Sequence, residues 1–236
     1  GMSVLFESVG GGAVVSRTKL QAIQRLGIGS ENKIVLRFKR AFWPDTHDHK
    51  YINCTDQRFR LLNYDSMGKA GVIVAHVSPP WANWICDKDG THIEHVCEGS
   101  RELDDTEVTR ELLKVLAKMF PKEGITHTQR VQQLEGQIVD RRITRWHSDP
   151  CAMGAYSYMR KGATFEDLAA MRDPEPHPQQ GPLFFAGEAT APPESMQCVH
   201  GAFATGRQAA DRILRLWYLR ERGCPACVRS RSGGGG

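Results

Sequence analysis

Gly181-Pro-Leu-Phe-Phe-Ala-Gly-Glu-Ala-Thr190 is the stretch of this sequence that decides its fold. Its apolar run at 183–186 predicts a short buried strand that ends at Gly187. A long helix is expected over residues 196–222, with small side chains along its first half. A glycine lets a ligand approach the backbone, and a helix N-terminus offers N–H groups and a positive dipole end. The pattern is therefore typical of a nucleotide-like cofactor site, although ordinary packing of a helix on a sheet explains the small residues equally well.

The upstream sequence predicts a series of strands with helices inserted between them. The apolar, β-branched runs alternate as strands do, and the helical segments carry apolar residues at helical spacing. Strands are expected at residues 33–38, 59–64, 71–77 and 137–146, and helices at 18–26, 104–119 and 165–171. This order predicts an α+β fold, in which a mixed-sheet domain is followed by a strand and helix that belong to an α/β domain.

The composition is that of an ordinary globular protein, with 40% hydrophobic and 25% charged residues and a mean hydropathy of −0.43. No apolar run is long enough to span a bilayer, and the first residues lack the features of a signal peptide. The seven cysteines are scattered, which indicates reduced thiols in an intracellular, reducing compartment. The net charge of +4 is mild and indicates a solvated surface rather than a nucleic-acid site.

Several segments together resemble the flavin-dependent amine oxidase family. Residues 184–190, then Val199-His-Gly-Ala202 and Gly206-Arg-Gln-Ala-Ala-Asp-Arg212, are similar to the segment of that family that contacts FAD near its C-terminus. Upstream, residues 26–36, 42–44, 145–150 and 154–158 agree with the family in order and spacing. The resemblance covers roughly residues 18–218. It is closest to the branch of lysine-specific histone demethylases and plant-type polyamine oxidases, and more distant from monoamine oxidases.

The resemblance implies three residues on the substrate side. Lys33 matches the lysine that holds a water beside the flavin N5, so it is the expected catalytic residue. Trp146 matches an aromatic residue that contacts the isoalloxazine, and Tyr156 matches one in the aromatic wall of the cavity; both are expected to bind substrate. From the pattern alone, Lys33 is a surface lysine and the two aromatics are core residues. Cys151 departs from relatives that often carry an aromatic residue there, which puts the shape of this wall in question.

On the cofactor side, the resemblance implies that FAD contacts Gly187, Glu188, Cys198 and Val199. Glu188 is expected near the ribityl–diphosphate part, and Cys198 and Val199 near the pyrimidine edge of the flavin. From the pattern alone, Glu188 is an acid that precedes a helix. In this family, hydride passes from the amine's α-carbon to the flavin, the imine hydrolyses, and O₂ reoxidises the flavin with release of H₂O₂.

The Gly-x-Gly-x-x-Gly turn that holds the FAD diphosphate in this family is not found in the sequence. The chain is therefore expected to be a C-terminal part of such an enzyme: a partial substrate-binding domain at 1–175, the last segment of the FAD-binding domain at 176–222 and a disordered tail at 223–236. Its partners would be the N-terminal FAD-binding half, an amine substrate and chromatin proteins, with no membrane. Alone, the chain is expected neither to retain FAD nor to oxidise amines.

The leading hypothesis is oxidative demethylation of lysine in histones, which places the protein in the nucleus. A polyamine oxidase, in the cytoplasm, and a non-catalytic binding module are the alternatives. No metal site is expected. The acidic and histidine residues at 45–49 and 92–95 favour solvated loops, and Cys224 and Cys227 have the spacing of only half a zinc site.

Overall fold

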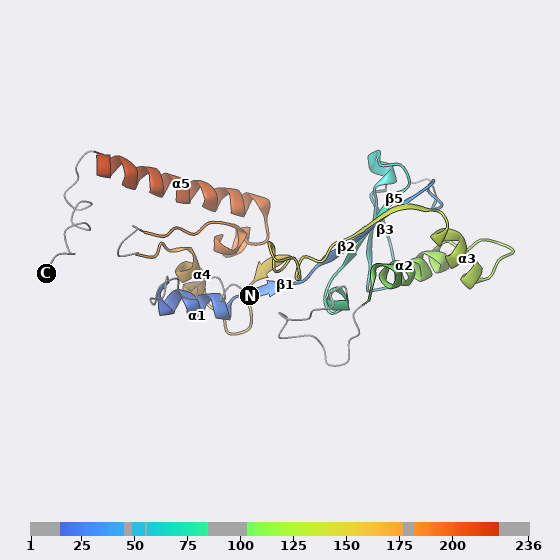
Figure 1. The fold of residues 1–236 in the computed structure, drawn as a ribbon, viewed down its shortest axis with the longest axis horizontal. Coiled ribbons are helices and arrows are strands. Elements are labelled where there is room, and N and C mark those ends of the chain that lie inside the picture. The colour runs from blue at the N-terminus through green and yellow to red at the C-terminus, as the bar shows by residue number, and fades with distance from the viewer. Residues whose placement is uncertain (1–14, 45–48, 55, 85–102, 177–181, 222–236) are drawn as a thin grey trace. The chain divides into compact units, whose positions relative to one another are not determined.

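The computed structural model describes the chain except residues 1–14, 45–48, 55, 85–102, 177–181 and 222–236 (Figure 1). Two compact units emerge, one formed by Ser30–Ala155 and the other by Gly1–Gly29 together with Tyr156–Gly236. These bounds differ from the division at residue 175 expected from the family. The expected division separates a substrate-binding part from an FAD-binding part, and it stays a prediction.

The unit Ser30–Ala155 is built on an antiparallel sheet with the strand order β3-β4-β5-β2-β6. The strands predicted at 33–38, 59–64 and 71–77 are confirmed. The strand predicted at 137–146 is shorter, and the two-residue β3 was not predicted because so short a run has no visible alternation. The strands are β2 (Asn32–Phe38), β3 (Tyr51–Ile52), β4 (Arg60–Asn63), β5 (Val72–Val77) and β6 (Ile138–Ile143), with short 3-10 turns η2 (Asp65–Met67) and η3 (Trp81–Trp84).

Helices α2 (Asp105–Met119) and α3 (His127–Glu135) belong to the same unit. The Asp104 side chain accepts hydrogen bonds from the backbone N–H groups of Thr106 and Glu107, and the Glu107 side chain accepts one from the Asp104 N–H. This capping box starts α2 where the sequence predicted it. The sequence pattern missed α3, whose apolar positions are few. A second capping box starts it at Thr126.

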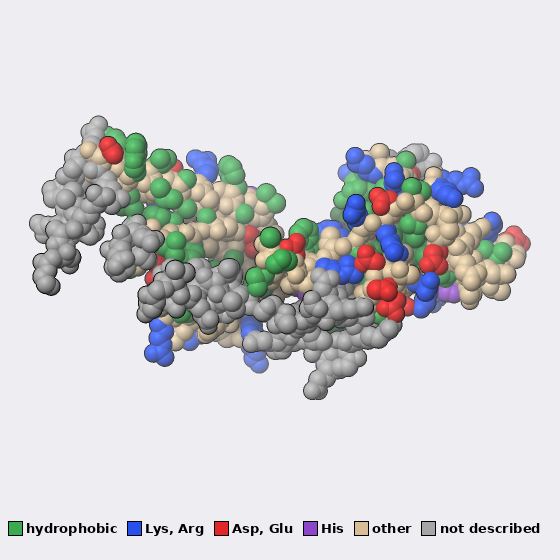
Figure 2. All heavy atoms as spheres, in the orientation of Figure 1, with side chains coloured by type: hydrophobic (Ala, Val, Ile, Leu, Met, Phe, Trp, Pro, Cys, Tyr) green, Lys and Arg blue, Asp and Glu red, His purple; other side chains and the backbone are tan. Residues whose placement is uncertain are grey.

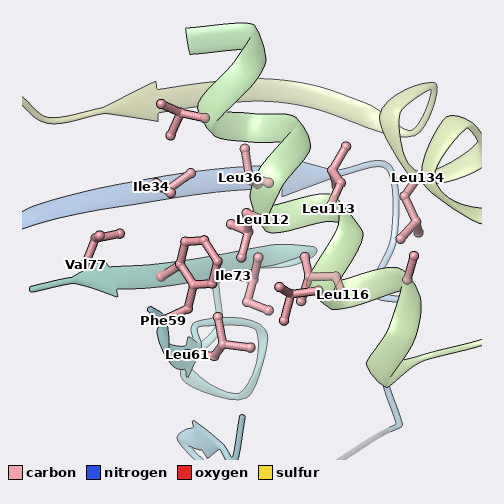
Figure 3. Packing of buried hydrophobic residues seen from close by; sticks show 14 of the residues in the cluster. Ile34, Leu36, Phe59, Leu61, Ile73, Val77, Leu112, Leu113, Leu116 and Leu134 are labelled. Carbon is pink, nitrogen blue, oxygen red and sulfur yellow. The ribbon is translucent and has the colours of Figure 1, made fainter. Parts of the chain in front are cut away.

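One face of the sheet is buried beneath α2. The leucines of this helix point toward β2 and β5, whose inward side chains meet them (Figure 3). The apolar residues that recur at helical spacing along this segment are buried at Val108, Leu112, Val115 and Leu116, and Leu113 is buried beside them. The centre of this core consists of Ile34, Leu36, Phe38, Phe59, Leu61, Ile73, Ala75, Val77, Val108, Leu112, Leu113, Leu116, Val131 and Leu134.

In its described residues, the second unit contains three α-helices and one short antiparallel pair of strands. Strand β1 pairs antiparallel with β7 although they are far apart in sequence. The helices predicted at 18–26, 165–171 and 196–222 are confirmed within a few residues. The elements are α1 (Arg17–Arg25), β1 (Gly27–Gly29), β7 (Tyr156–Tyr158), α4 (Phe165–Arg172), η4 (Glu188–Thr190), η5 (Pro193–Ser195) and α5 (Val199–Glu221). With the sheet of the other unit, they confirm the α+β class.

The strand predicted at 183–186 is wrong for the described residues. Leu183 forms a single antiparallel bridge with Glu175, through backbone bonds of 2.9 and 2.8 Å. A strand exists only where a neighbouring strand pairs with it, and residues 184–186 form no ladder within the described chain. The apolar run therefore marked a segment that is extended but unpaired.

A buried lysine holds α1 against the residues that follow α4. Lys19 is fully buried, and its Nζ donates to the carbonyl oxygens of Met171 (3.1 Å) and Asp173. The ammonium lies 4.0 Å from the centre of the Phe185 ring and 3.9 Å from a Glu175 oxygen. Burial lowers the pKa of Lys19, and the two nearby acids oppose that shift.

Arg58 links the residues before β4 to α2. Its guanidinium donates to Asp56 (2.9 Å) and to Glu111 of α2 (3.0 Å). The hydrogen bond from Arg58 holds the pKa of Asp56 below its usual 3.8. Hydrogen bonds from Lys114 and then Arg58 hold the pKa of Glu111 below its usual 4.5. Carboxyl groups of lowered pKa stabilise the folded state above their unfolded values, and that stabilisation is lost as the pH falls through the lowered pKa.

We therefore expect the free energy of unfolding to fall below about pH 4, and Asp56→Asn to make that fall less steep. Chemical denaturation at a series of acidic pH values measures it. Arg58→Met should flatten the dependence at least as much, because Arg58 also bonds Glu111, and the double variant should flatten it little more than Arg58→Met alone. An Asp56→Asn protein with the same pH dependence as the wild type would refute the contribution of this pair.

Two glycines of α5 allow a matched test of how closely this helix packs. A Cβ on Gly201 would lie 2.1 Å from the Ser195 carbonyl oxygen, whereas a Cβ on Gly206 meets nothing within 4 Å. Gly201→Ala should destabilise the fold by about 2 kcal/mol, because the chain must shift to relieve the clash. Gly206→Ala should stabilise it by up to about 1 kcal/mol through helix propensity. Urea unfolding of both variants measures the difference, and equal effects would contradict the packing described.

Candidate functional site

Within Ser30–Ala155, the buried amide of Asn32 brings the predicted residues Lys33 and Trp146 to the same end of the sheet. Its Nδ2 donates to the Ala82 carbonyl (3.2 Å), and its Oδ1 accepts from the Thr144 hydroxyl (3.2 Å) and from the Trp146 backbone N–H (3.1 Å). A buried amide is costly unless bonded in this way. The segment after β6, which carries Trp146, is therefore attached beside the start of β2.

Lys33 is bonded to the same segment through its backbone. Its N–H donates to the Thr144 hydroxyl (2.8 Å), and its carbonyl accepts from the Thr144 N–H (3.0 Å). Successive side chains of a strand alternate between faces, and Ile34 and Leu36 enter the core. Lys33 therefore lies on the opposite face of the sheet.

Trp146 is 40% exposed. A core aromatic of this size would be largely enclosed, so the interpretation of Trp146 as a core residue does not hold within its own unit. Its carbonyl accepts from the Gly154 N–H (2.9 Å), which closes the loop after β6. The indole thus stands on a braced backbone with much of its surface available to a ligand.

In the second unit, Tyr156 on β7 lies over a glycine. β7 pairs with β1 so that Tyr156 is opposite Gly29 and Tyr158 opposite Gly27. A Cβ on either glycine would come within 2.4 Å of the facing tyrosine ring. Only glycine lets these rings lie flat across the neighbouring strand, so the two glycines set the position of the tyrosines.

Glu188 ties β7 to the turn that precedes α5. Its Oε1 accepts from the Ser157 hydroxyl (2.7 Å) and from the Gln197 N–H (2.7 Å). Gln197 has a left-handed φ of 63°, and its side chain donates to the Ser157 carbonyl (3.0 Å). The Glu188 carboxylate is thus hydrogen-bonded to two other residues of this unit. The pattern alone had identified it only as an acid that precedes a helix.

Gly187 adopts a φ of 126°, which only glycine takes readily, and a Cβ there would meet no atom within 4 Å. Its N–H donates to the hydroxyl of Thr205 on α5 (3.1 Å). The turn is therefore held against the helix while open space remains beside Gly187. A ligand could approach the backbone there, as the sequence predicted.

The start of α5 is the most exposed of the predicted cofactor positions. Val199 is 88% exposed and Cys198 is partly buried. The first N–H groups of a helix have no partner within it, and they carry a partial positive charge. The exposed helix start, the strained Gln197 turn and the open backbone at Gly187 fit the electron-rich edge of a flavin.

The predicted residues thus fall into two groups. Lys33 and Trp146 come together in one unit; Tyr156, Gly187, Glu188, Cys198 and Val199 come together in the other. The sequence pattern did not predict the polar residues that position them. The one available signal was a polar side chain at an inward strand position, as at Asn32. The missed residues are Asn32, Thr144, Ser157, Gln197 and Thr205.

In the described part of the chain, no three His, Cys, Asp or Glu residues lie close enough together to hold a metal ion. Of the residues considered as metal ligands at 45–49, 92–95, 224 and 227, His49 is described and belongs to no such group, and the others lie outside the described residues. Of the helices that the structure describes, none combines the length and the apolar character needed to span a membrane.

Comparison with known proteins agrees with this geometry. "Possible lysine-specific histone demethylase 1" of Drosophila melanogaster is 30% identical over 218 residues, covering 88% of this chain and 21% of that protein. "Peroxisomal N(1)-acetyl-spermine/spermidine oxidase" of Bos taurus is 28% identical over 207 residues, covering 84% of this chain and 38% of that protein. The fold is similar to that of wild-type putrescine oxidase bound to putrescine, with a TM-score of 0.59 and 23% identity over 85% of this chain and 38% of that one.

The chain therefore spans 38% or less of each of these proteins. The family model described as "Flavin containing amine oxidoreductase" matches residues 3–214, which is most of the sequence. This chain belongs to the flavin-containing amine oxidoreductase family, whose members use a flavin cofactor.

Proposed function

We propose that this chain is the C-terminal part of an FAD-dependent amine oxidase that demethylates lysine side chains of histones. The observation that supports the proposal is the hydrogen-bond network around the buried Asn32 amide, which binds the N–H of the exposed Trp146 and the hydroxyl of Thr144. The same Thr144 hydroxyl accepts from the Lys33 N–H. A lysine and an exposed indole at one end of a sheet suit a neutral amine, because removal of the amine from water disfavours its charged form. The protein would act in the nucleus.

Bound FAD would supply the acceptor for the hydride that leaves the carbon beside the amine nitrogen. The residues of this chain would bind the substrate, orient water and stabilise charge on the cofactor. Lys33 would orient a water molecule, Trp146 and Tyr156 would form aromatic surfaces for the substrate, and the N-terminus of α5 would favour negative charge on the cofactor. Glu188 would stabilise the backbone conformation of the turn at Gln197, from whose N–H it accepts a hydrogen bond.

A polyamine oxidase is the second candidate. It is favoured by the similarity to a protein named as an acetyl-spermine/spermidine oxidase, just as demethylation is favoured by the similarity to a protein named as a possible histone demethylase. Both candidates use the same chemistry at the nitrogen. They differ in the rest of the substrate, a peptide in one case and a slender polycation in the other.

The α5 helix supports the proposal that a further FAD-binding part covers this chain. Val199, Phe203, Leu214 and Trp217 are 88, 68, 59 and 60% exposed. At 100° per residue they fall on the side of α5 opposite the buried Gly201 and Thr205. Hydrophobic side chains follow α5 at the upper left of Figure 2. Apolar faces of this kind mark a docking surface, and we assign it to the FAD-binding half that we propose precedes this chain.

The activity predicts release of H₂O₂ by the full-length protein with an amine substrate. A methylated-lysine histone peptide should give release above that with spermine, and the reverse result would favour the polyamine oxidase. Lys33→Met should lower kcat about 100-fold, the usual scale for a group that assists proton transfer. Lys39→Met, just beyond the same strand, should leave kcat unchanged. Release with neither substrate would count against both enzymes and favour a non-catalytic module.

The FAD assignment predicts that the chain alone purifies without bound flavin, because the Gly-rich diphosphate turn is not in its sequence. Co-expression with the N-terminal half as a separate polypeptide should give a complex with flavin absorbance. Trp217→Glu should abolish co-purification, whereas Gln208→Glu, on the other side of α5, should not. A yellow preparation of the chain alone would contradict the prediction.

A further inference from the structure

The face of the sheet that carries Lys33 also carries a histidine that the proposed function does not use. Lys33 on β2 is directly opposite His76 on β5, and His76 is directly opposite Arg60 on β4. Residues paired in this way point to the same face, with Cβ atoms about 5 Å apart. Neighbouring Ile34 and Ala75 enter the core, so the row lies on the face away from α2.

A carboxylate orients this histidine. The Nδ1 of His76 lies 2.8 Å from Oε1 of Glu31, the residue just before β2, and both side chains are about a quarter exposed. A carboxylate only accepts hydrogen bonds, so Nδ1 carries the proton in this contact. In the neutral imidazole the other nitrogen, Nε2, is then left as a proton acceptor.

The charged groups around His76 come from each element beside it. Lys33 faces it from β2, Arg60 from β4, and Glu31 from the residue preceding β2. The Arg60 guanidinium lies 3.8 Å from the same Glu31 oxygen and donates to the Ser78 hydroxyl (2.6 Å). Glu31 is thus held from two sides, which fixes the carboxylate that orients the imidazole.

Amine oxidation requires the free amine, whereas an alkyl amine in water at neutral pH is an ammonium ion. We propose that His76, oriented by Glu31, accepts the proton that the substrate ammonium loses before oxidation. The inference rests on the proposed function. In this step an N–H bond of the ammonium breaks and an N–H bond forms at Nε2, while the electron pair stays on the substrate nitrogen. No electron is transferred, and the imidazolium later returns the proton to solvent.

His76 is then a catalytic residue, because it contacts the reacting nitrogen. Glu31 is a positioning residue, because it acts through the tautomer of His76. Lys33 keeps its separate role in orienting water. The arrangement places a base and a lysine side by side on one sheet face, and this combination depends on the register of β2 with β5.

The test follows flavin reduction by the methylated-lysine peptide in the full-length FAD-loaded protein without O₂, from about pH 7 to above the amine pKa of about 10.4. His76→Gln should lower the second-order rate constant of reduction roughly 100-fold at neutral pH. The loss should vanish at high pH, where the substrate is already a free amine. Glu31→Gln should give a smaller loss with the same pH dependence.

Arg37→Gln is the matched control, because Arg37 lies on the same face of β2 and is exposed. Its pH profile should equal that of the wild type. Thermal unfolding checks that each variant is folded, and His76→Asn replaces His76→Gln if the latter is not. A loss of equal size at every pH, or no loss, would overturn the role of His76. A wild type that no amine reduces would instead overturn the proposed function.

A second readout does not depend on activity. In protein labelled with ¹⁵N-histidine, the signal absent from His76→Gln belongs to His76, and its nitrogen shifts report the tautomer. The Nδ1–H tautomer should dominate in the wild type and give way to a mixture in Glu31→Gln. Dominance of Nε2–H in the wild type would overturn the inference, since no acceptor nitrogen would then be available.

Discussion

The buried amide of Asn32 is the interaction on which the substrate-side residues depend. It is fully enclosed, and its two polar atoms bind the Ala82 carbonyl, the Thr144 hydroxyl and the Trp146 N–H. An unbonded amide in this position would cost a few kcal/mol, so the start of β2, the end of β6 and the turn at Ala82 must meet here. These hydrogen bonds, with that between the Lys33 N–H and Thr144, bring the backbones of Lys33 and Trp146 to the same end of the sheet.

In the second unit, the Glu188 carboxylate organises the predicted site residues as the Asn32 amide does in the first. Glu188 bonds Ser157 of β7 and Gln197 before α5, and so fixes the strand that carries Tyr156 relative to the helix start that carries Val199. It holds Gln197 in a conformation that a non-glycine residue adopts only under constraint. Each unit thus contains one polar residue that organises several predicted site residues: Asn32 in one unit, and in the other Glu188, which is itself expected to contact FAD.

Much of the fold follows from patterns that the chain carries locally. The strands with clear alternation and the helices with apolar residues at helical spacing appear where they are expected, since these signals depend on neighbours within a few positions. Helix α3 was missed because its apolar positions are few. The errors in strand prediction share a cause, because a strand needs a pairing partner that the local sequence does not specify. The run at 183–186 has the composition of a strand, yet only Leu183 finds a partner in the described chain. β1 and β7 carry little strand signal, yet they pair because glycines face tyrosines.

The sequence by itself determined the family, the α+β class and which residues resemble a flavin amine oxidase site, because these rest on residue types and their spacing. The tertiary structure alone decided which of them meet. Lys33 faces away from the core because of strand alternation, and His76 stands beside it because of the register between β2 and β5. Glu188 proved to be bonded within its own unit. Register and hydrogen-bond partners join residues far apart in the chain, so no local pattern encodes them.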